Sequence, residues 1–128
     1  MAAKWQIVTL KESHMAAEDV MSLTFDAPEF PDFKAGQHVD VRLTAPNGYQ
    51  AERSYSLANP PEEKGTVELG VQLLPDGEVS PYLFTLKPGA QIELRGPIGG
   101  HFVWERVMPG PLVLIGGGSG MVPLMSML

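Results

Sequence analysis

The segment Arg53-Ser54-Tyr55-Ser56 places a guanidinium, a phenol and a hydroxyl within four residues, at the end of a stretch that is typical of a β-strand. Because side chains alternate along a strand, Arg53 and Tyr55 should point to the same side. Arginine donates a fork of hydrogen bonds to phosphate oxygens, and tyrosine offers a face for stacking. The pair therefore suits a ligand with a flat ring system and an anionic tail. The alternative is a half-buried strand with an arginine on its solvent side.

A second anion-binding feature is a predicted helix start further along the chain. Ser80 is a suitable N-cap and Pro81 suits the first helical position, so we expect a short helix that continues over residues 82–86. The unpaired N–H groups at a helix N-terminus bind phosphate, and Gly77 lets the backbone come close to a ligand. Alone, the segment is compatible with an ordinary capped helix. Together with Arg53, it predicts a pyrophosphate held between strand and helix.

Five segments of the chain together resemble the ferredoxin–NADP⁺ reductase superfamily. Arg53-x-Tyr55-Ser56 followed by Gly77-x-x-Ser80 is similar to the flavin-binding signature of that family. The other three segments are residues 33–39, which resemble a strand entry, 96–102, which resemble the end of the barrel, and 115–123, which resemble the opening of the pyridine-nucleotide domain. They follow the family's order over nearly the whole chain.

The resemblance implies an FAD cofactor and a role for each site residue. Arg53 would bind the pyrophosphate, Tyr55 would stack on the isoalloxazine, and Ser56 would lie near flavin N5, where a hydride arrives. Tyr55 and Ser56 are therefore the predicted catalytic residues. Strict alternation puts Ser56 opposite Tyr55, so its role requires the strand to twist or end there. The other residues expected around the cofactor are Gly77, Val79 and Ser80 at the pyrophosphate and Val71, Gln72 and Leu73 at the flavin edge.

The composition favours one globular domain and argues against nucleic acid as a partner. Of 128 residues, 44% are hydrophobic and 19% are charged, and the formal net charge is −6 with no basic cluster that could neutralise phosphates. The chain has no cysteine, so it cannot form disulfides or hold a cysteine-ligated iron–sulfur cluster. The three histidines lack metal-ligand spacing. The N-terminus lacks the apolar core of a signal peptide, and we expect a cytoplasmic protein without a membrane span.

Short segments punctuated by 14 glycines and 12 prolines favour an all-β fold. Alternation and turn signals predict six strands, over residues 5–10, 19–25, 38–43, 53–58, 66–74 and 91–94. The register of the second strand is open, because Val20 and Leu23 fall on opposite parities. This pattern predicts a small antiparallel barrel or sandwich. The resemblance narrows it to a six-stranded antiparallel Greek-key barrel with one short capping helix.

The character of the chain changes after the predicted FAD-binding domain, residues 1–108. Residues 111–115 are a continuous apolar run, typical of a strand buried on both faces, and a glycine-rich turn follows. By resemblance, residues 109–128 begin an NAD(P)-binding domain, with Pro123 in place of the last glycine of the usual dinucleotide fingerprint. The cofactor-binding residues predicted in this turn are Gly117, Gly118, Ser119 and Gly120. We expect residues 111–128 to mediate self-association or to fold back against the barrel.

By resemblance, the chain is the FAD-binding part of a flavin-dependent oxidoreductase. NAD(P)H would pass a hydride to the flavin, which would release electrons singly to an iron–sulfur or haem partner protein. A βαβ unit needs roughly 30 residues, so we expect the 128-residue chain alone to be incomplete for NAD(P)H turnover. Two alternatives remain. One is a free-standing flavin-binding or electron-carrying module without nicotinamide chemistry, and the other is a riboflavin synthase-like barrel, which leaves the glycine-rich C-terminal segment unexplained.

Overall fold

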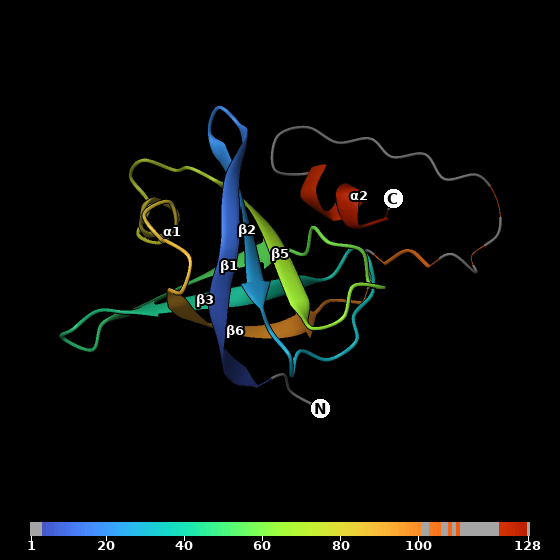
Figure 1. Cartoon of the computed structure of the whole chain (residues 1–128), viewed down its shortest axis with the longest axis horizontal. Coiled ribbons are helices and arrows are strands. Elements are labelled where there is room, and N and C mark those ends of the chain that lie inside the picture. Colours follow the sequence, from blue (N-terminus) through green and yellow to red (C-terminus); the bar gives the residue numbers. More distant parts are fainter. Residues whose placement is uncertain (1–3, 101–102, 106–107, 109, 111–120, 128) are drawn as a thin grey trace.

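The computed structural model describes residues 4–100, 103–105, 108, 110 and 121–127, which form one antiparallel sheet with two short helices (Figure 1). The elements are β1 (Trp5–Ala17), β2 (Val20–Asp26), β3 (His38–Thr44), β4 (Gln50–Ser56), β5 (Thr66–Gln72), α1 (Ser80–Leu83), β6 (Gln91–Ile98) and α2 (Met121–Met127). The prediction of a six-stranded, antiparallel, all-β fold is confirmed. The helices, of 4 and 7 residues, are both far too short to cross a membrane.

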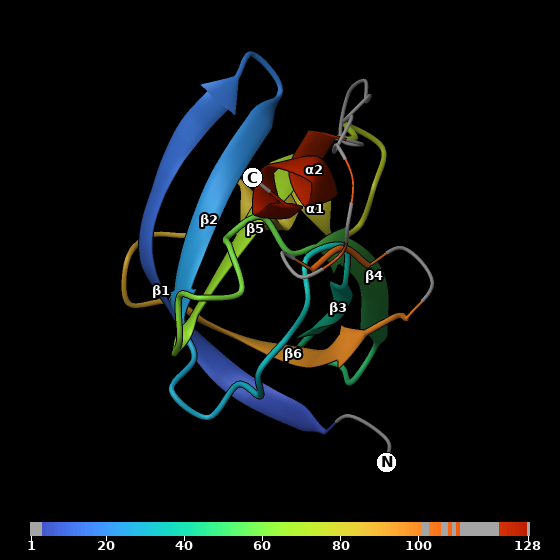
Figure 2. The ribbon, with the colours of Figure 1, turned by 90° about the vertical axis from the view of Figure 1, so that its right-hand side faces the viewer.

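The strands lie in the order β4-β3-β6-β1-β2-β5, so β6 sits between β3 and β1. Such non-sequential neighbours are those of a Greek key. The sheet curves strongly but does not close, and β4 and β5 are its two edges (Figure 2). Just beyond the end of β4, an isolated bridge joins Leu57 to Leu69 of β5. The barrel is therefore open along the seam between β4 and β5.

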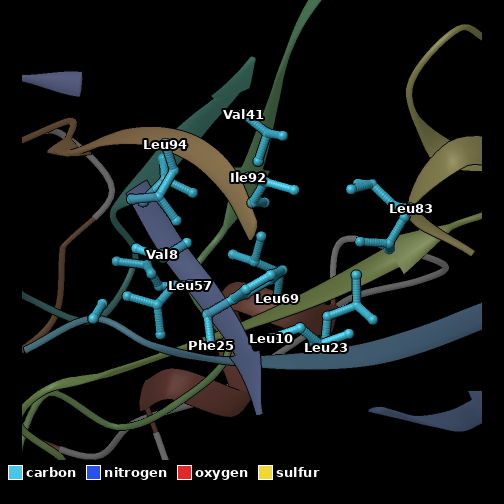
Figure 3. Close-up of a cluster of buried hydrophobic side chains, with 14 of the residues drawn as sticks. Val8, Leu10, Leu23, Phe25, Val41, Leu57, Leu69, Leu83, Ile92 and Leu94 are labelled. Carbon is cyan, nitrogen blue, oxygen red and sulfur yellow. The ribbon is translucent and has the colours of Figure 1, made fainter. Parts of the chain in front are cut away.

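The core fills the concave side of the sheet, and its alternation follows the predicted strand pattern. In β5, Val67, Leu69 and Val71 are each 0% exposed, and the residues between them are half-buried. In β2, both Leu23 and Phe25 are fully buried, which resolves the register that the sequence left open. Figure 3 shows Leu23, Phe25 and Leu69 meeting in this cluster. Burial of this apolar surface is the main stabilising contribution to the fold.

On the outer face, the ring of Trp5 lies between two arginines. The guanidinium carbon of Arg42 lies 4.1 Å from the ring centroid and that of Arg95 lies 4.5 Å from it. Arg42 forms an ion pair with Glu93 at 2.6 Å, and Arg95 forms one with Asp40 at 2.8 Å. These two arginines have partners on both sides, since each combines a cation–π contact with a carboxylate. They hold β1, β3 and β6 together and are structural.

Three strands differ in length from the prediction. β1 continues to Ala17 because its second half forms a hairpin with β2, with Ala17 opposite Val20. The side chains of this half are mostly exposed, so no burial pattern in the sequence marks it. β4 begins at Gln50, earlier than predicted, because it pairs with β3 from the turn onward. β6 continues to Ile98, where it still pairs with β3. In each case pairing with a neighbour extends the strand, which local sequence does not report.

Candidate functional site

A pocket of about 250 Å³ lies at the open seam of the sheet, beside the end of β4. Its walls come from β4, from β5 and the residues after it, and from α2, which lies next to β5 in both ribbon views (Figures 1 and 2). The lining residues are Arg53, Ser54, Tyr55, Ser56, Gly70, Gln72, Leu74 and Val122. Four residues of the predicted cofactor site therefore line a single pocket: Arg53, Tyr55, Ser56 and Gln72.

Arg53 has no carboxylate within ion-pair distance among the residues that the structure describes, whereas Arg42 and Arg95 each have one. The Arg53 side chain is exposed, and its Nη1 donates a hydrogen bond to the main-chain oxygen of Glu52 at 2.6 Å. A guanidinium carries five N–H donors, so most of them remain available to an anion. The structural role that accounts for the other two arginines does not account for Arg53.

Tyr55 is half-buried and packs against the core. Burial raises the pKa of its phenol, and the positive charge of Arg53 opposes that shift only in part. The phenol therefore stays neutral at physiological pH. A neutral aromatic ring held by the core and lining the pocket suits stacking on a flat heterocycle.

Ser56 and Tyr55 both line the pocket, although alternation directs them to opposite faces of β4. β4 is an edge strand that ends at Ser56, and the chain then turns toward β5 at the bridge of Leu57. This is the strand end that the predicted role of Ser56 requires. Contact between its hydroxyl and a bound flavin stays a prediction.

Ser54 also lines the pocket, but its hydroxyl already has a partner. It donates a hydrogen bond to Oδ1 of Asp40 at 2.7 Å. Burial alone would raise the pKa of Asp40, but the hydrogen bonds from Arg95 and Ser54 and the nearby positive charges outweigh burial and lower it. Asp40 is therefore ionised and holds Ser54 in place. We assign Ser54 a structural role.

The prediction that Ser80 caps a helix is wrong. The N-cap of α1 is Val79, which makes no side-chain capping hydrogen bond, and the helix covers Ser80–Leu83 rather than residues 82–86. The Ser80 hydroxyl instead accepts a hydrogen bond from the main-chain N–H of Leu74 at 2.9 Å. That N–H lies past the end of β5 and would otherwise lack a partner inside the protein. Ser80 therefore closes the loop after β5 and does not present its side chain to a phosphate.

The rest of this loop also differs from the predicted phosphate cradle. Val79 is 1% exposed, and its side chain belongs to the core. A Cβ at Gly77 would lie 3.1 Å from the main-chain oxygen of Leu74, so the tight turn itself favours glycine there. The Gly77 N–H donates to that same oxygen at 2.8 Å. Phosphate contacts from Val79 and Ser80 can therefore come only from their main chain.

The three residues predicted at the flavin edge occupy different positions. Val71 is fully buried, so its side chain packs in the core and does not reach a ligand. Gln72 lines the pocket, and its side-chain amide donates to Oδ2 of Asp19 at 3.2 Å. Leu73 is half-buried and does not line the pocket; its N–H donates to the main-chain oxygen of Asp19 at 2.8 Å. Of the three, only Gln72 has its side chain in the pocket wall.

The sequence analysis missed Gly70 and Val122, which meet at the pocket. A Cβ at Gly70 would lie 2.6 Å from Cγ2 of Val122, so α2 packs directly on the backbone of β5. The signal was available, since a glycine inside a strand often marks a close approach by another element. On its other side, α2 buries Leu124 and Met127 in a small cluster with Ala35, against which Trp104 packs.

A buried hydrogen bond fixes α2 in this position. The hydroxyl of Ser126 donates to the main-chain oxygen of Asn59 at 2.7 Å. Asn59 is itself 0% exposed and holds the loop before β5 through its side-chain amide, which donates to the main-chain oxygen of Thr66 at 2.8 Å. Residues 121–127 thus have the fold-back arrangement, one of the two expected for the C-terminal segment. Self-association through residues 111–128 stays a prediction.

Replacing Gly70 by alanine should displace α2 and destabilise the protein. Val122 is β-branched, so its side chain has little rotamer freedom with which to yield. Overpacking of this kind costs about 1–3 kcal/mol. The free energy of unfolding from urea denaturation measures it, and hydrogen exchange of the α2 amides reports the displacement.

The matched control for this substitution is the double variant Gly70→Ala, Val122→Ala. It removes both γ carbons that the new methyl group would meet, and the nearest remaining atom, Cβ of residue 122, lies 3.6 Å away. The double variant should therefore recover most of the stability that Gly70→Ala loses relative to Val122→Ala. Additive losses would mean that α2 does not sit on β5 at Gly70.

Two further predictions need separate statements. The four residues of the glycine-rich turn, Gly117, Gly118, Ser119 and Gly120, lie outside the described residues, as does most of the predicted second domain. Within the described part of the chain, no group of three or more histidine, aspartate or glutamate side chains is arranged to hold a metal ion. The chemistry of the pocket is therefore that of Arg53, Tyr55 and Ser56.

Comparison with known proteins identifies what this arrangement belongs to. The family described as "Oxidoreductase FAD-binding domain" matches residues 7–104. The Na(+)-translocating NADH-quinone reductase of Shewanella putrefaciens has one subunit that is 31% identical over 160 aligned positions, which cover 96% of this chain and 52% of the relative. The chain thus spans about half the length of that relative.

Solved structures agree with this assignment. The flavohaem-like FAD/NAD-binding domain of nitric oxide dioxygenase from Vibrio cholerae O1 biovar El Tor superposes with a TM-score of 0.83 at 26% identity, covering 95% of this chain and 54% of that one. The cytochrome P450 reductase of Amycolatopsis gives 0.81 at 32% identity, covering 98% and 39%. The predicted flavin oxidoreductase class and FAD cofactor are confirmed, and the riboflavin synthase-like alternative loses its support. The chain belongs to the ferredoxin reductase-type FAD-binding domain family of oxidoreductases.

Proposed function

We propose that this chain carries FAD in the seam pocket and serves as the flavin module of a reductase that takes electrons from NAD(P)H and passes them to an iron–sulfur or haem protein. The observation that carries the proposal is Arg53, a cation without a described carboxylate partner, beside the half-buried ring of Tyr55 in a single pocket. A purely structural sheet edge would need neither feature.

The residues of the pocket divide the work of holding the cofactor. Arg53 donates hydrogen bonds to the phosphate oxygens, and Tyr55 provides the face on which the ring system stacks. Ser56, at the end of β4, supplies a hydroxyl that can donate or accept at the reactive edge of the ring. Gly70 has no side chain and Val122 is apolar, so the β5 side of the pocket is shaped and dry. When bound, the flavin itself supplies the hydride and single-electron chemistry.

The donor and acceptor are inferred from the relatives. One relative is named as a component of an NADH-quinone reductase, and two of the similar structures are a nitric oxide dioxygenase domain that binds FAD and NAD and a cytochrome P450 reductase. These names support a nicotinamide donor and a redox protein as acceptor, without deciding between NADH and NADPH. A free-standing flavin carrier would use the same pocket. A cytoplasmic location stays a prediction from the sequence.

The test is flavin loading followed by electron transfer. The purified chain is incubated with FAD, freed of excess cofactor, reduced anaerobically with dithionite, and mixed with cytochrome c as a one-electron haem acceptor. We expect a retained flavin spectrum, bleaching on reduction, and two cytochromes reduced per flavin. Free FAD at equal concentration is the control for uncatalysed transfer. A chain that retains no FAD, or FAD that cannot be reduced while bound, would contradict the proposal.

A further inference from the structure

A second cavity, of about 710 Å³, lies outside the seam pocket. It opens where the turn between β3 and β4, the start of β6 and α1 come together. Its apolar walls include Leu43, Ala51 and Ile92, and two tyrosine rings, Tyr49 and Tyr82, are 57% and 50% exposed at its surface. Nothing in the function proposed so far uses this cavity, which we call the hairpin cavity.

The hairpin cavity lies on the same side of β4 as the predicted cofactor residues. Tyr55, Arg53 and Ala51 are two residues apart along the strand, and they pair with Val39, Val41 and Leu43 of β3. Alternating residues share a face and are about 7 Å apart. Along this face, the order is therefore the ring of Tyr55, then the guanidinium of Arg53, then Ala51 in the wall of the hairpin cavity.

The electrostatics agree with Arg53 standing between the two cavities. A hydrogen bond to Glu78 and the charge of that carboxylate raise the pKa of Tyr49, and the charge of Arg53 opposes the shift. The Arg53 charge acts in the same sense on Tyr55. The guanidinium therefore lies within electrostatic range of one tyrosine from each cavity. An anion bound to Arg53 would have one end directed to each.

The lining of the hairpin cavity fits a purine nucleoside. Two partly exposed tyrosine rings offer faces for a flat heterocycle, and base–aromatic stacking is tolerant of which base is bound. The Glu78 carboxylate lies in the lining and accepts hydrogen bonds, as acidic residues do from ribose hydroxyls in dinucleotide sites. A flat ring, a sugar with free hydroxyls and a phosphate leading toward Arg53 together describe a nucleoside 5′-phosphate.

We propose that the hairpin cavity binds the adenosine half of FAD, with the adenine against Tyr82 and Tyr49 and the ribose hydroxyls donating to Glu78. This inference rests on the proposed function and deepens it. It explains why the cofactor is the dinucleotide, since FMN would leave the cavity empty. The pyrophosphate then bridges the two cavities at Arg53.

The test compares FAD with FMN in Tyr82→Ala. The apo form of the full chain is titrated with each flavin, and the dissociation constant is read from quenching of flavin fluorescence. Loss of base–aromatic stacking should weaken FAD binding about 5- to 150-fold and leave FMN binding unchanged, because FMN has no adenosine. Tyr82→Phe keeps the ring and should bind FAD as the wild type does. Tyr49→Leu provides a second variant should Tyr82→Ala fold poorly, which circular dichroism checks.

A second measurement separates the adenosine of FAD from that of a nicotinamide dinucleotide. 5′-AMP should bind the apo chain weakly and should not bind the FAD-loaded chain, since the cavity is then filled. Binding of 5′-AMP to the FAD-loaded chain would overturn the assignment. So would equal weakening of FAD and FMN by Tyr82→Ala, no weakening of either, or a wild type that binds FMN as tightly as FAD. A wild type that binds neither flavin would overturn the proposed function as well, which distinguishes the two failures.

Discussion

Replacing Arg53 by alanine is expected to weaken FAD binding roughly 10- to 150-fold. A hydrogen bond to a charged group contributes about 1.5–3 kcal/mol, and a tenfold change in affinity corresponds to about 1.4 kcal/mol. Riboflavin carries no phosphate, so its affinity should change little. Fluorescence titration of the apo chain with each ligand measures both dissociation constants under the same conditions.

Two matched variants make this result interpretable. Arg53→Lys keeps the charge but loses the bidentate fork, so its FAD affinity should fall between those of the wild type and Arg53→Ala. Lys11→Ala removes one positive charge from an exposed position in β1, away from both cavities, and should leave FAD binding intact. Equal loss of FAD and riboflavin in Arg53→Ala would show that Arg53 supports the fold of β4 rather than the phosphates.

Leu69→Ala should be among the most destabilising single substitutions in the sheet. Leu69 is 0% exposed and lies in β5, opposite Leu23 of β2 and bridged to Leu57 on the other side. Truncating a buried leucine costs about 2–5 kcal/mol, because the transfer free energy is lost and a cavity remains. Urea denaturation at constant pH measures the free energy of unfolding.

The position of Leu69 adds a functional consequence. It lies where the two edges of the sheet meet, next to Gly70 in the wall of the seam pocket, so FAD affinity should also fall. The control is Leu74→Ala, which removes the same atoms from a side chain that is 59% exposed. Substitutions at such positions usually change stability by less than about 0.5 kcal/mol. A loss at Leu74 as large as that at Leu69 would mean that burial in the core does not set the cost.

The sequence alone determined the strand content and part of the site. Alternation in residues 38–43 and 66–72 predicted which side chains face the core, because a strand buried on one face must separate apolar from polar residues with a period of two. The same rule predicted that Arg53 and Tyr55 share a face. The type and spacing of these two residues pointed to a phosphate-bearing aromatic ligand, and the family comparison agrees.

The tertiary structure decided which groups were already occupied. Ser80 has the residue type of a helix cap, but its hydroxyl bonds to Leu74, since the chain after β5 needed a partner there. Val71 has the right position in the sequence for a flavin contact, but the period of two sends its side chain into the core. A local pattern predicts what a side chain could bind, and only the fold decides what it does bind.

The neighbours across the seam were also beyond the reach of local sequence. Gly70 and Val122 are far apart in the chain, yet α2 packs on β5 at that glycine and completes the pocket wall. The hairpin cavity likewise combines Tyr49, Glu78 and Tyr82 from the two sides of β5 in sequence. Residue types and spacing report only contacts along one strand or helix. Contacts between elements depend on how the sheet curves and leaves its edges open, which is set by the summed packing of the whole core.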